Sequence, residues 1–312
     1  MRYLLIVFLF LFPAILSADC RGLASPRGVP AAEADQWSLA TVNLWRLRDS
    51  DKDSDLDDPV PPAVLEKRLR AVADFIAGPL QAPQLLALQE VENIGLLKRV
   101  VEALRRRGLR YRAVLEEGND PSGMDVALLY RDPVAVESVS SLFAAQQFHG
   151  HPLFSRPPLQ VTLSAPWPVQ VVVVHLRSAR DLRQRRVHEK RQTQSALLAN
   201  WAKSRGGPLI VAGDFNTTWN AGRFSASYER FQQSGLINVW QTLPKEERYS
   251  FRYRCRPQAL DHIWVTPGLV ERIKGAAVSR GNAGRYDSLY GSDGVSPVSD
   301  HDVLTVYFSR ED

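Results

Sequence analysis

Two kinds of apolar pattern alternate along this chain. Short runs such as LLAL (85–88) and VVVV (171–174) are apolar at every position, which is typical of strands buried on both faces. Longer segments, such as 93–108, have apolar residues at helical spacing and therefore keep one exposed face. The pattern predicts β-sheet on the inside of the molecule and helices on the outside.

The expected elements of both kinds are mixed throughout the chain. The pattern predicts helices at 63–78, 93–108 and 182–204, and strands at 37–43, 84–90, 124–131, 169–178, 209–215, 259–265 and 302–308. An acidic segment (49–62) and a segment rich in glycine, serine and aspartate (281–300) are predicted to be loops. Because no repeat or linker interrupts these elements, they indicate one α/β domain over 37–312. Either one doubly wound sheet or two sheets packed face to face would satisfy the pattern.

The N-terminus has the layout of a secretory signal peptide. Residues 1–18 combine Arg2, a long apolar run and small residues, and a polar leader follows at 19–36. We expect cleavage after Ala18 and a secreted or periplasmic protein. A retained membrane anchor is the alternative, although the apolar run is short for a complete span. The two cysteines, Cys20 and Cys255, would in an oxidising compartment either form one disulfide or remain separate thiols.

Polar side chains occur at the ends of several expected strands. They are carboxylates, amides and imidazoles in every case, namely Asn43, Glu90, His175, Asp214 with Asn216, Asp261, and Asp300 with His301. A cap or a turn explains any single one of them, but not why the strand ends share so narrow a set. If the ends converge, their hard oxygen atoms suit Mg²⁺ or Mn²⁺ better than zinc, and such a metal typically works with substrate phosphates.

These residues belong to a series of motifs that follow one another along the chain. The motifs are TVNLW (41–45), LLALQEVEN (85–93), MDVALLYR (124–131), VVVVHLRS (171–178), RQTQSALL (191–198), IVAGDFN (210–216), ALDHIWV (259–265) and SDHDVL (299–304). In this order they resemble the endonuclease/exonuclease/phosphatase superfamily, which includes secreted DNase I-like nucleases. The resemblance implies the second arrangement, a four-layer α/β sandwich in which two packed mixed β-sheets are flanked by helices.

The resemblance also implies a metal centre and a proton acceptor. Glu90 matches the metal-binding glutamate of the superfamily, and Asn43 and Asp300 match positions near that metal. His301 matches the histidine that acts as general base on the attacking water, and Asp261 matches the carboxylate that orients it. Such pairing fixes the tautomer of an imidazole and raises its basicity. The implied cofactor is Mg²⁺, with Mn²⁺ or Ca²⁺ as further options.

A second set of matched residues concerns the phosphate. Asp214 and Asn216 match the pair that positions the nucleophile and the phosphate, and on a strand they would share one face. His175 matches a second histidine, which contacts the phosphate, and Asp125 stands where the carboxylate partner of that histidine falls. Arg177 shares a strand face with His175, so we expect it to bind substrate.

Two further segments leave alternatives open. The basic run at 180–192 either grips a phosphate backbone or forms an exposed helix face. Tyr249, Phe251 and Tyr253 alternate with other residues, and a core or edge-strand face is expected for them ahead of base stacking. With 39 basic and 34 acidic residues, the net charge of +5 suits an anionic partner.

Together these observations predict a secreted, metal-dependent phosphodiesterase. The first expectation is an endonuclease that hydrolyses DNA or RNA by direct attack of water on the phosphate. The alternative is a phosphatase or phosphodiesterase acting on small or lipid esters such as inositol phosphates or sphingomyelin. A non-catalytic binding protein on the same scaffold is a third hypothesis. We expect a nucleic acid substrate, no stable membrane partner and a monomer.

Overall fold

Two six-stranded mixed β-sheets form the centre of the fold. The computed structural model describes residues 23–219, 222, 225–285 and 297–311. The first sheet has the strand order β15-β16-β1-β2-β4-β3, formed by β1 (Gln36–Leu47), β2 (Leu85–Val91), β3 (Arg112–Leu115), β4 (Asp125–Tyr130), β15 (Ile273–Val278) and β16 (Leu304–Ser309). The second has the order β11-β14-β10-β9-β8-β5, formed by β5 (Ala135–Ser141), β8 (Leu159–Ala165), β9 (Val169–His175), β10 (Leu209–Asp214), β11 (Ile237–Asn238) and β14 (Asp261–Val265). In each sheet one central pair is parallel, β1 with β2 and β9 with β10.

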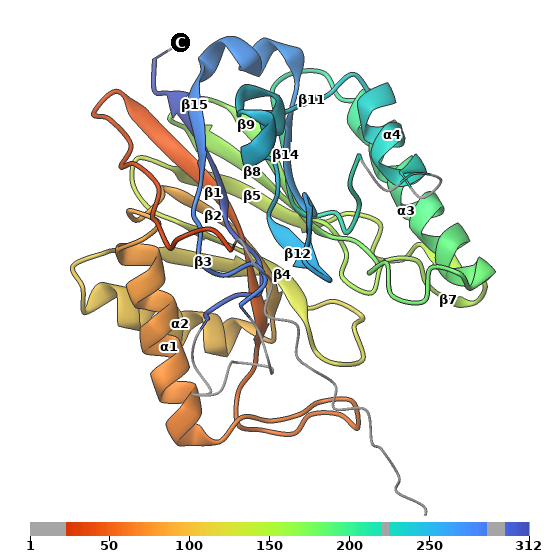
Figure 1. Cartoon of the computed structure of the whole chain (residues 1–312), viewed down its shortest axis with the longest axis horizontal. Helices are drawn as coiled ribbons and strands as arrows, with labels where there is room; N and C mark the ends of the chain where they lie inside the picture. Colours follow the sequence, from red (N-terminus) through yellow and green to blue (C-terminus); the bar gives the residue numbers. More distant parts are fainter. Residues whose placement is uncertain (1–22, 220–221, 223–224, 286–296, 312) are drawn as a thin grey trace, which may run out of the picture.

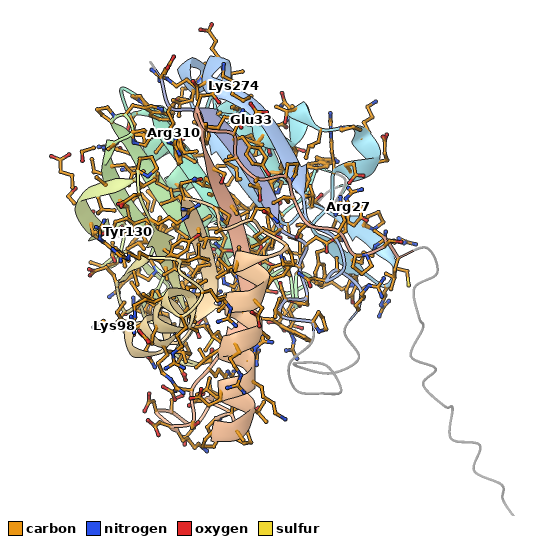
Figure 2. The ribbon with its side chains drawn as sticks, turned by 90° about the vertical axis from the view of Figure 1, so that its left-hand side faces the viewer. Arg27, Glu33, Lys98, Tyr130, Lys274 and Arg310 are labelled. Atoms are coloured by element: carbon orange, nitrogen blue, oxygen red, sulfur yellow. The ribbon has the colours of Figure 1, made fainter. Side chains whose placement is uncertain are left out.

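Helices cover the outer face of each sheet (Figure 1). α1 (Pro62–Ala77) and α2 (Ile94–Arg105) pack against the first sheet, and α3 (Arg185–Lys203) and α4 (Ala226–Gln233) pack against the second. In the side view of Figure 2, charged side chains such as Lys98 of α2 and Lys274 of β15 lie on the outside of these layers. The layers follow the order helices, sheet, sheet, helices. The four-layer α/β sandwich is therefore confirmed.

Smaller elements complete the fold. Two hairpins lie beside the sheets, one formed by β6 (Gln147–Phe148) and β7 (His151–Pro152), the other by β12 (Phe251–Tyr253) and β13 (Arg256–Gln258). Short 3₁₀ helices occur at Val239–Thr242, Lys245–Glu247 and Pro267–Arg272.

The two buried faces of each sheet explain why the strands are apolar at consecutive positions. In β10, Ile210 and Ala212 lie in the core between the sheets, whereas Leu209 and Val211 lie in the core beneath α3 and α4. Side chains alternate across a strand, so a strand covered on both sides needs apolar residues at odd and even positions alike.

Several boundaries and elements differ from the sequence prediction. β9 ends at His175 rather than at 178, and α3 begins at Arg185 rather than at 182. β16 begins at Leu304, so Asp300 and His301 lie in the loop before the strand. The pattern did not reveal β3, β5, β8, β15 or α4. These elements are short, or they bury only one side of an alternating sequence, and their apolar signal is correspondingly weak.

The expected signal peptide, the two cysteines and the possibility of a membrane anchor can be compared with the structure only in part. Residues 1–18, expected to be a signal peptide, and Cys20 lie outside the described residues. Cys255 is disulfide-bonded, and no cysteine among the described residues is free. Of the helices that the structure describes, none has both the length and the apolar character needed to span a bilayer.

Candidate active site

Strand alternation directs four of the predicted site residues into the gap between the sheets. His175 continues the positions of Val171 and Val173 in β9, which lie in the core between the sheets. By the same alternation Asp261 of β14, Asp214 of β10 and Asn43 of β1 face this gap at the ends of their strands. In register, Asp214 is paired with both His175 and Asp261. The three side chains therefore stand next to one another across neighbouring strands.

Glu90 reaches the same gap through a β-bulge rather than through alternation. Its φ of +62° places it in the left-handed region, and the pairing of β2 with β4 shifts register between Gln89 and Val91. A bulge of this kind re-aims one side chain. Asn43 Nδ2 donates to Glu90 Oε1 at 3.1 Å, and the backbone N–H of Arg46 donates to Glu90 Oε2 at 2.8 Å. The carboxylate is thus held by two donors at the edge of the cavity.

A tight turn, and not a strand face, brings Asn216 beside Asp214. Gly213 has a φ of +145°, and a Cβ there would lie 2.0 Å from the carbonyl oxygen of Val174, so only glycine fits. β10 ends at Asp214, and Asn216 adopts a left-handed conformation (φ +51°). Its N–H donates to Asp214 Oδ1 at 2.7 Å, and its Nδ2 donates to the carbonyl of Leu176 at 3.0 Å.

His301 and Asp261 form a close carboxylate–imidazole pair. His301 Nδ1 and Asp261 Oδ2 are 2.6 Å apart, and both side chains are buried. Burial opposes protonation of His301, but the Asp261, Asp300 and Asp214 carboxylates prevail and raise its pKa well above the ordinary value. The pair is held by two serines that sequence reasoning missed. Ser250 Oγ accepts from the N–H of Asp261 at 3.1 Å, and Ser299 Oγ accepts from the N–H of His301 at 2.9 Å.

Several of these side chains line one cavity of about 750 Å³, which we call the catalytic cavity after the role predicted for its residues. Its lining includes the predicted residues Glu90, His175, Asp214, Asn216, Asp300 and His301, together with Phe251, Tyr253, Ser178, Arg180, Asp181 and Gln258. Asn43 is not a lining residue, but it contacts two of them. Its Nδ2 donates to Glu90 Oε1 at 3.1 Å and to Asp214 Oδ2 at 3.4 Å. The structure therefore brings together the predicted metal, base and phosphate-positioning residues.

The donor atoms in this cavity fit a divalent cation. Asp214, Asp261 and His301 have ligand atoms within 4.8 Å of one another, and Asp261 Oδ1 is buried without a hydrogen-bond partner among the described residues. Burial and the Asp261 carboxylate raise the pKa of Asp214 to about 7, and burial raises that of Asp300 to about 6. Such crowded oxygen donors suit Mg²⁺ or Mn²⁺.

The predicted Asp125–His175 pair is not formed. His175 Nδ1 is buried and has no hydrogen-bond partner among the described residues. Asp125 instead lines a separate acidic cavity and interacts with Glu117; burial and that neighbour raise its pKa to about 8. The Asp125 carboxylate lies against Gly118, where a Cβ would come within 2.5 Å of its Oδ1. Burial, with the charges of Arg156 and His301, keeps the pKa of His175 well below its ordinary value, so the ring is neutral.

Arg177 also lies elsewhere than the sequence predicted. β9 ends at His175, so strand alternation no longer applies to Arg177, and its side chain lines a neighbouring cavity rather than the catalytic one. Phe251 and Tyr253 do lie on an edge hairpin, as expected, but they also line the catalytic cavity. The Phe251 ring lies 4.8 Å from that of His301, and Tyr253 is 53% exposed.

The fold and the cavity together define a class of protein, the α/β sandwiches of two packed sheets with carboxylates and imidazoles gathered at their strand ends. Comparison with known families agrees with this class. Residues 40–301 match the Endonuclease/Exonuclease/phosphatase family, and the chain belongs to it. Members of this family are hydrolases that act on phosphoester bonds, and they generally depend on divalent metals.

Sequence relatives share only part of their length with this chain. UPF0294 protein VV2535 and UPF0294 protein VV1_1880, from Vibrio vulnificus strains YJ016 and CMCP6, are each 33% identical over 123 residues. The match covers 39% of this chain and 34% of each relative, so the chain spans about a third of the length of these curated relatives.

Solved structures share the fold along most of this chain. A 3′ phosphatase, NExo from Neisseria, bound to a product DNA hairpin, has a TM-score of 0.61 at 19% identity over 88% of this chain and 99% of its own. Humanized TDP2 of D. rerio has a TM-score of 0.59 at 20% identity over 88% of this chain and 100% of its own. A family member from Bacteroides vulgatus has a TM-score of 0.59 at 17% identity over 88% and 99%.

Proposed function

We propose that this protein is a metal-dependent endonuclease that hydrolyses DNA or RNA by direct attack of water on the phosphate. The observation that carries the proposal is the Asp261–His301 pair, whose His301 lines one cavity with the Glu90 and Asp214 carboxylates. A buried base beside crowded oxygen donors suits hydrolysis of an anionic ester. Ser178 lines the cavity, but its Oγ accepts from the N–H of Arg180 at 3.1 Å and has no imidazole partner among the described residues, so the proposal contains no covalent intermediate.

The residues have separate tasks in this proposal. Glu90, with Asn43 and Asp300 beside it, would hold a divalent cation, which when bound offsets charge on the phosphate and the leaving oxygen. His301 Nε2 takes the proton of the attacking water, while Asp261 holds Nδ1 and stabilises the imidazolium that forms. Asp214 orients the water.

His175 binds the phosphate as a neutral hydrogen-bond donor. Its Nε2 lies 3.5 Å from Asp214 Oδ2 and 4.0 Å from Glu90 Oε1, so these carboxylates favour the tautomer with the proton on Nε2. A phosphate oxygen in the cavity would accept that proton as a hydrogen bond. The Asn216 amide carries two N–H groups on Nδ2. One donates to the carbonyl of Leu176, and the second is left to donate to the phosphate.

Three observations support nucleic acid as the substrate. The chain carries a net charge of +5, which suits a polyanion. Phe251 and Tyr253 line the cavity and offer aromatic surface beside the reacting phosphate, where a base can stack. The solved structures that share this fold include the Neisseria 3′ phosphatase bound to a product DNA hairpin. The signal-like sequence at 1–18 supports export of the protein as part of the same proposal.

A side-by-side assay tests this function. Purified protein with Mg²⁺ is incubated with plasmid, single-stranded DNA, RNA, inositol phosphates and sphingomyelin, with the His301→Ala variant and a chelator as blanks. We expect internal cleavage of nucleic acid by the parent protein alone, and only with metal present. Hydrolysis confined to inositol phosphates or sphingomyelin would replace the proposal with the small-ester alternative. Absence of any hydrolysis would leave a binding protein.

A further inference from the structure

A second cavity, of about 470 Å³, is lined by positive charge. Arg177, Arg186 and Lys190 line it together with His151, Asn119 and Ser155, and no carboxylate is among its lining residues. We call it the cationic cavity. It lies between the β6–β7 hairpin and the beginning of α3, which are neighbours in Figure 1, and Lys190 Nζ donates to the carbonyl of Pro152 at 2.8 Å.

The two arginines of this cavity have no side-chain partner in the part of the chain that the structure describes. Neither the Arg177 nor the Arg186 guanidinium makes a hydrogen bond or ion pair with another residue that the structure describes. Three cations converge on this cavity. Burial and the charges of Arg177, Arg186 and Arg156 lower the pKa of Lys190, against the opposing charge of Asp120. Such crowding is unfavourable unless an anion enters the cavity.

The cationic cavity is fixed relative to the catalytic cavity through α3. The N–H of Arg177 donates to Gln194 Oε1 at 2.9 Å, and the carbonyl of Arg177 accepts from Arg191 Nη1. Arg191 Nη2 also donates to the carbonyl of Asn216 at 2.6 Å. Both α3 residues are buried. Arg177 follows His175 by two residues, and Ser178 already lines the catalytic cavity, so the two cavities meet along one short segment.

We propose that the cationic cavity binds a backbone phosphate that neighbours the scissile phosphate in the same nucleic acid strand. This inference rests on the proposed function and adds the substrate class, a polymer with phosphates at regular intervals. Arg186 and Arg177 would each donate to phosphate oxygens, while Lys190 supplies charge. A simple phosphodiester has only one phosphate, so it fills the catalytic cavity and leaves the cationic cavity empty.

The test compares a polymer with a single phosphodiester. We would measure kcat/KM for a labelled oligothymidylate and for bis(p-nitrophenyl) phosphate with the parent protein, Arg177→Ala, Arg186→Ala and the control Lys203→Ala. Lys203 is an exposed cation in the last turn of the same helix, so the control removes the same charge at the far end of α3. Thermal unfolding of each variant checks the fold.

We expect the ratio of the two kcat/KM values to fall on the order of tenfold for each arginine variant, since a charge-assisted hydrogen bond is lost. The control should not change this ratio. In the catalytically blocked His301→Ala background, fluorescence anisotropy should show weaker oligothymidylate binding for the arginine variants. The slope of log affinity against log salt should become shallower by about 0.7 per cation removed.

The outcomes separate this inference from the proposed function. The inference is wrong if an arginine variant lowers kcat/KM equally for the oligothymidylate and for the diester. It is also wrong if Lys203→Ala lowers the ratio of the two values as much as the arginine variants do. In either case the cationic cavity binds no separate phosphate. If no nucleic acid is cleaved while bis(p-nitrophenyl) phosphate is, the proposed function fails, and the anisotropy measurement then decides the cationic cavity by itself. Unchanged binding in that measurement would overturn the inference.

Discussion

Asp261→Asn would remove the charge that holds His301 while almost preserving the shape of the site. Asp261 Oδ2 lies 2.6 Å from His301 Nδ1, and the Asp261 side chain is 1% exposed. The substitution exchanges one carboxylate oxygen for an amide of similar volume. The imidazole can still be contacted at Nδ1, but no negative charge remains there to stabilise the imidazolium.

The size of the effect follows from this contact. A hydrogen bond to a charged group contributes ~1.5–3 kcal/mol, which corresponds to roughly 10- to 150-fold in the stability of the imidazolium. Since the carboxylate is among the groups that raise the pKa of His301, its loss should lower that pKa and shift the acidic limb of the rate profile to lower pH. An amide that donates to Nδ1 would also select the wrong tautomer. We therefore expect kcat to fall by ~10²–10⁴-fold, the range of positioned general-base catalysis.

The assay is hydrolysis of bis(p-nitrophenyl) phosphate at saturating Mg²⁺ between pH 5 and pH 10, with thermal unfolding as a check on folding. Asp181→Asn is the matched control, because Asp181 also lines the catalytic cavity but is exposed and has no imidazole partner among the described residues. We expect this control to retain most of the parent activity. A folded Asp261→Asn variant with the parent rate and pH profile would refute the assignment of Asp261 to the proton acceptor.

Three further predictions follow from the same structure. Glu90→Gln should recover part of its lost activity in excess Mg²⁺, whereas His301→Ala should not, because only the second removes the proton acceptor; equal recovery in a metal titration would contradict this division. Burial and Glu117 raise the pKa of Asp125 to about 8, so the folded state holds this proton more tightly than the unfolded chain does, and stability falls as pH rises from about 4 to 8. Asp125→Asn should therefore gain roughly 1–3 kcal/mol over the parent at pH 9 but little at pH 4, and a pH-independent difference in unfolding free energy would count against it. Mass spectrometry of a non-reduced digest should yield a Cys20–Cys255 crosslinked peptide, since Cys255 is disulfide-bonded, and two free thiols in the oxidised protein would disprove that pairing.

Residues on regular strands could be placed from the sequence. Asp214, His175 and Asp261 come together because buried strands with a period of two present their last residues on predictable faces, and the family motifs supplied the sheet arrangement. The sequence motifs identified Glu90 and Asn216 as site residues, but not how they reach the site. Both depend on a left-handed backbone conformation, which no apolar pattern reports.

The errors in the site prediction have a physical origin in loop conformation and in strand length. Asp125 was paired with His175 by motif position alone, but the loop before β4 places Glu117 and Gly118 beside its carboxylate, and no apolar pattern reports the path of that loop. Arg177 was assigned to the face of His175, but the strand ends between them. The cationic cavity was hidden for another reason. The run at 180–192 indicated positive charge, but the hairpin that closes the cavity around Lys190 is contributed by residues 147–152.

The first sheet joins strands from both ends of the domain, because β16 lies between β15 and β1. The loop before β16 carries Asp300 and His301, and His301 then bonds to Asp261 of the second sheet. During synthesis on the ribosome, a chain that has emerged only as far as β14 already contains Glu90 and Asp214 but has no proton acceptor. Under the proposed function, such a nascent chain would not hydrolyse the RNA around it. The Asp261–His301 pair can form only when residues 299–309 have emerged and β16 has paired with β1.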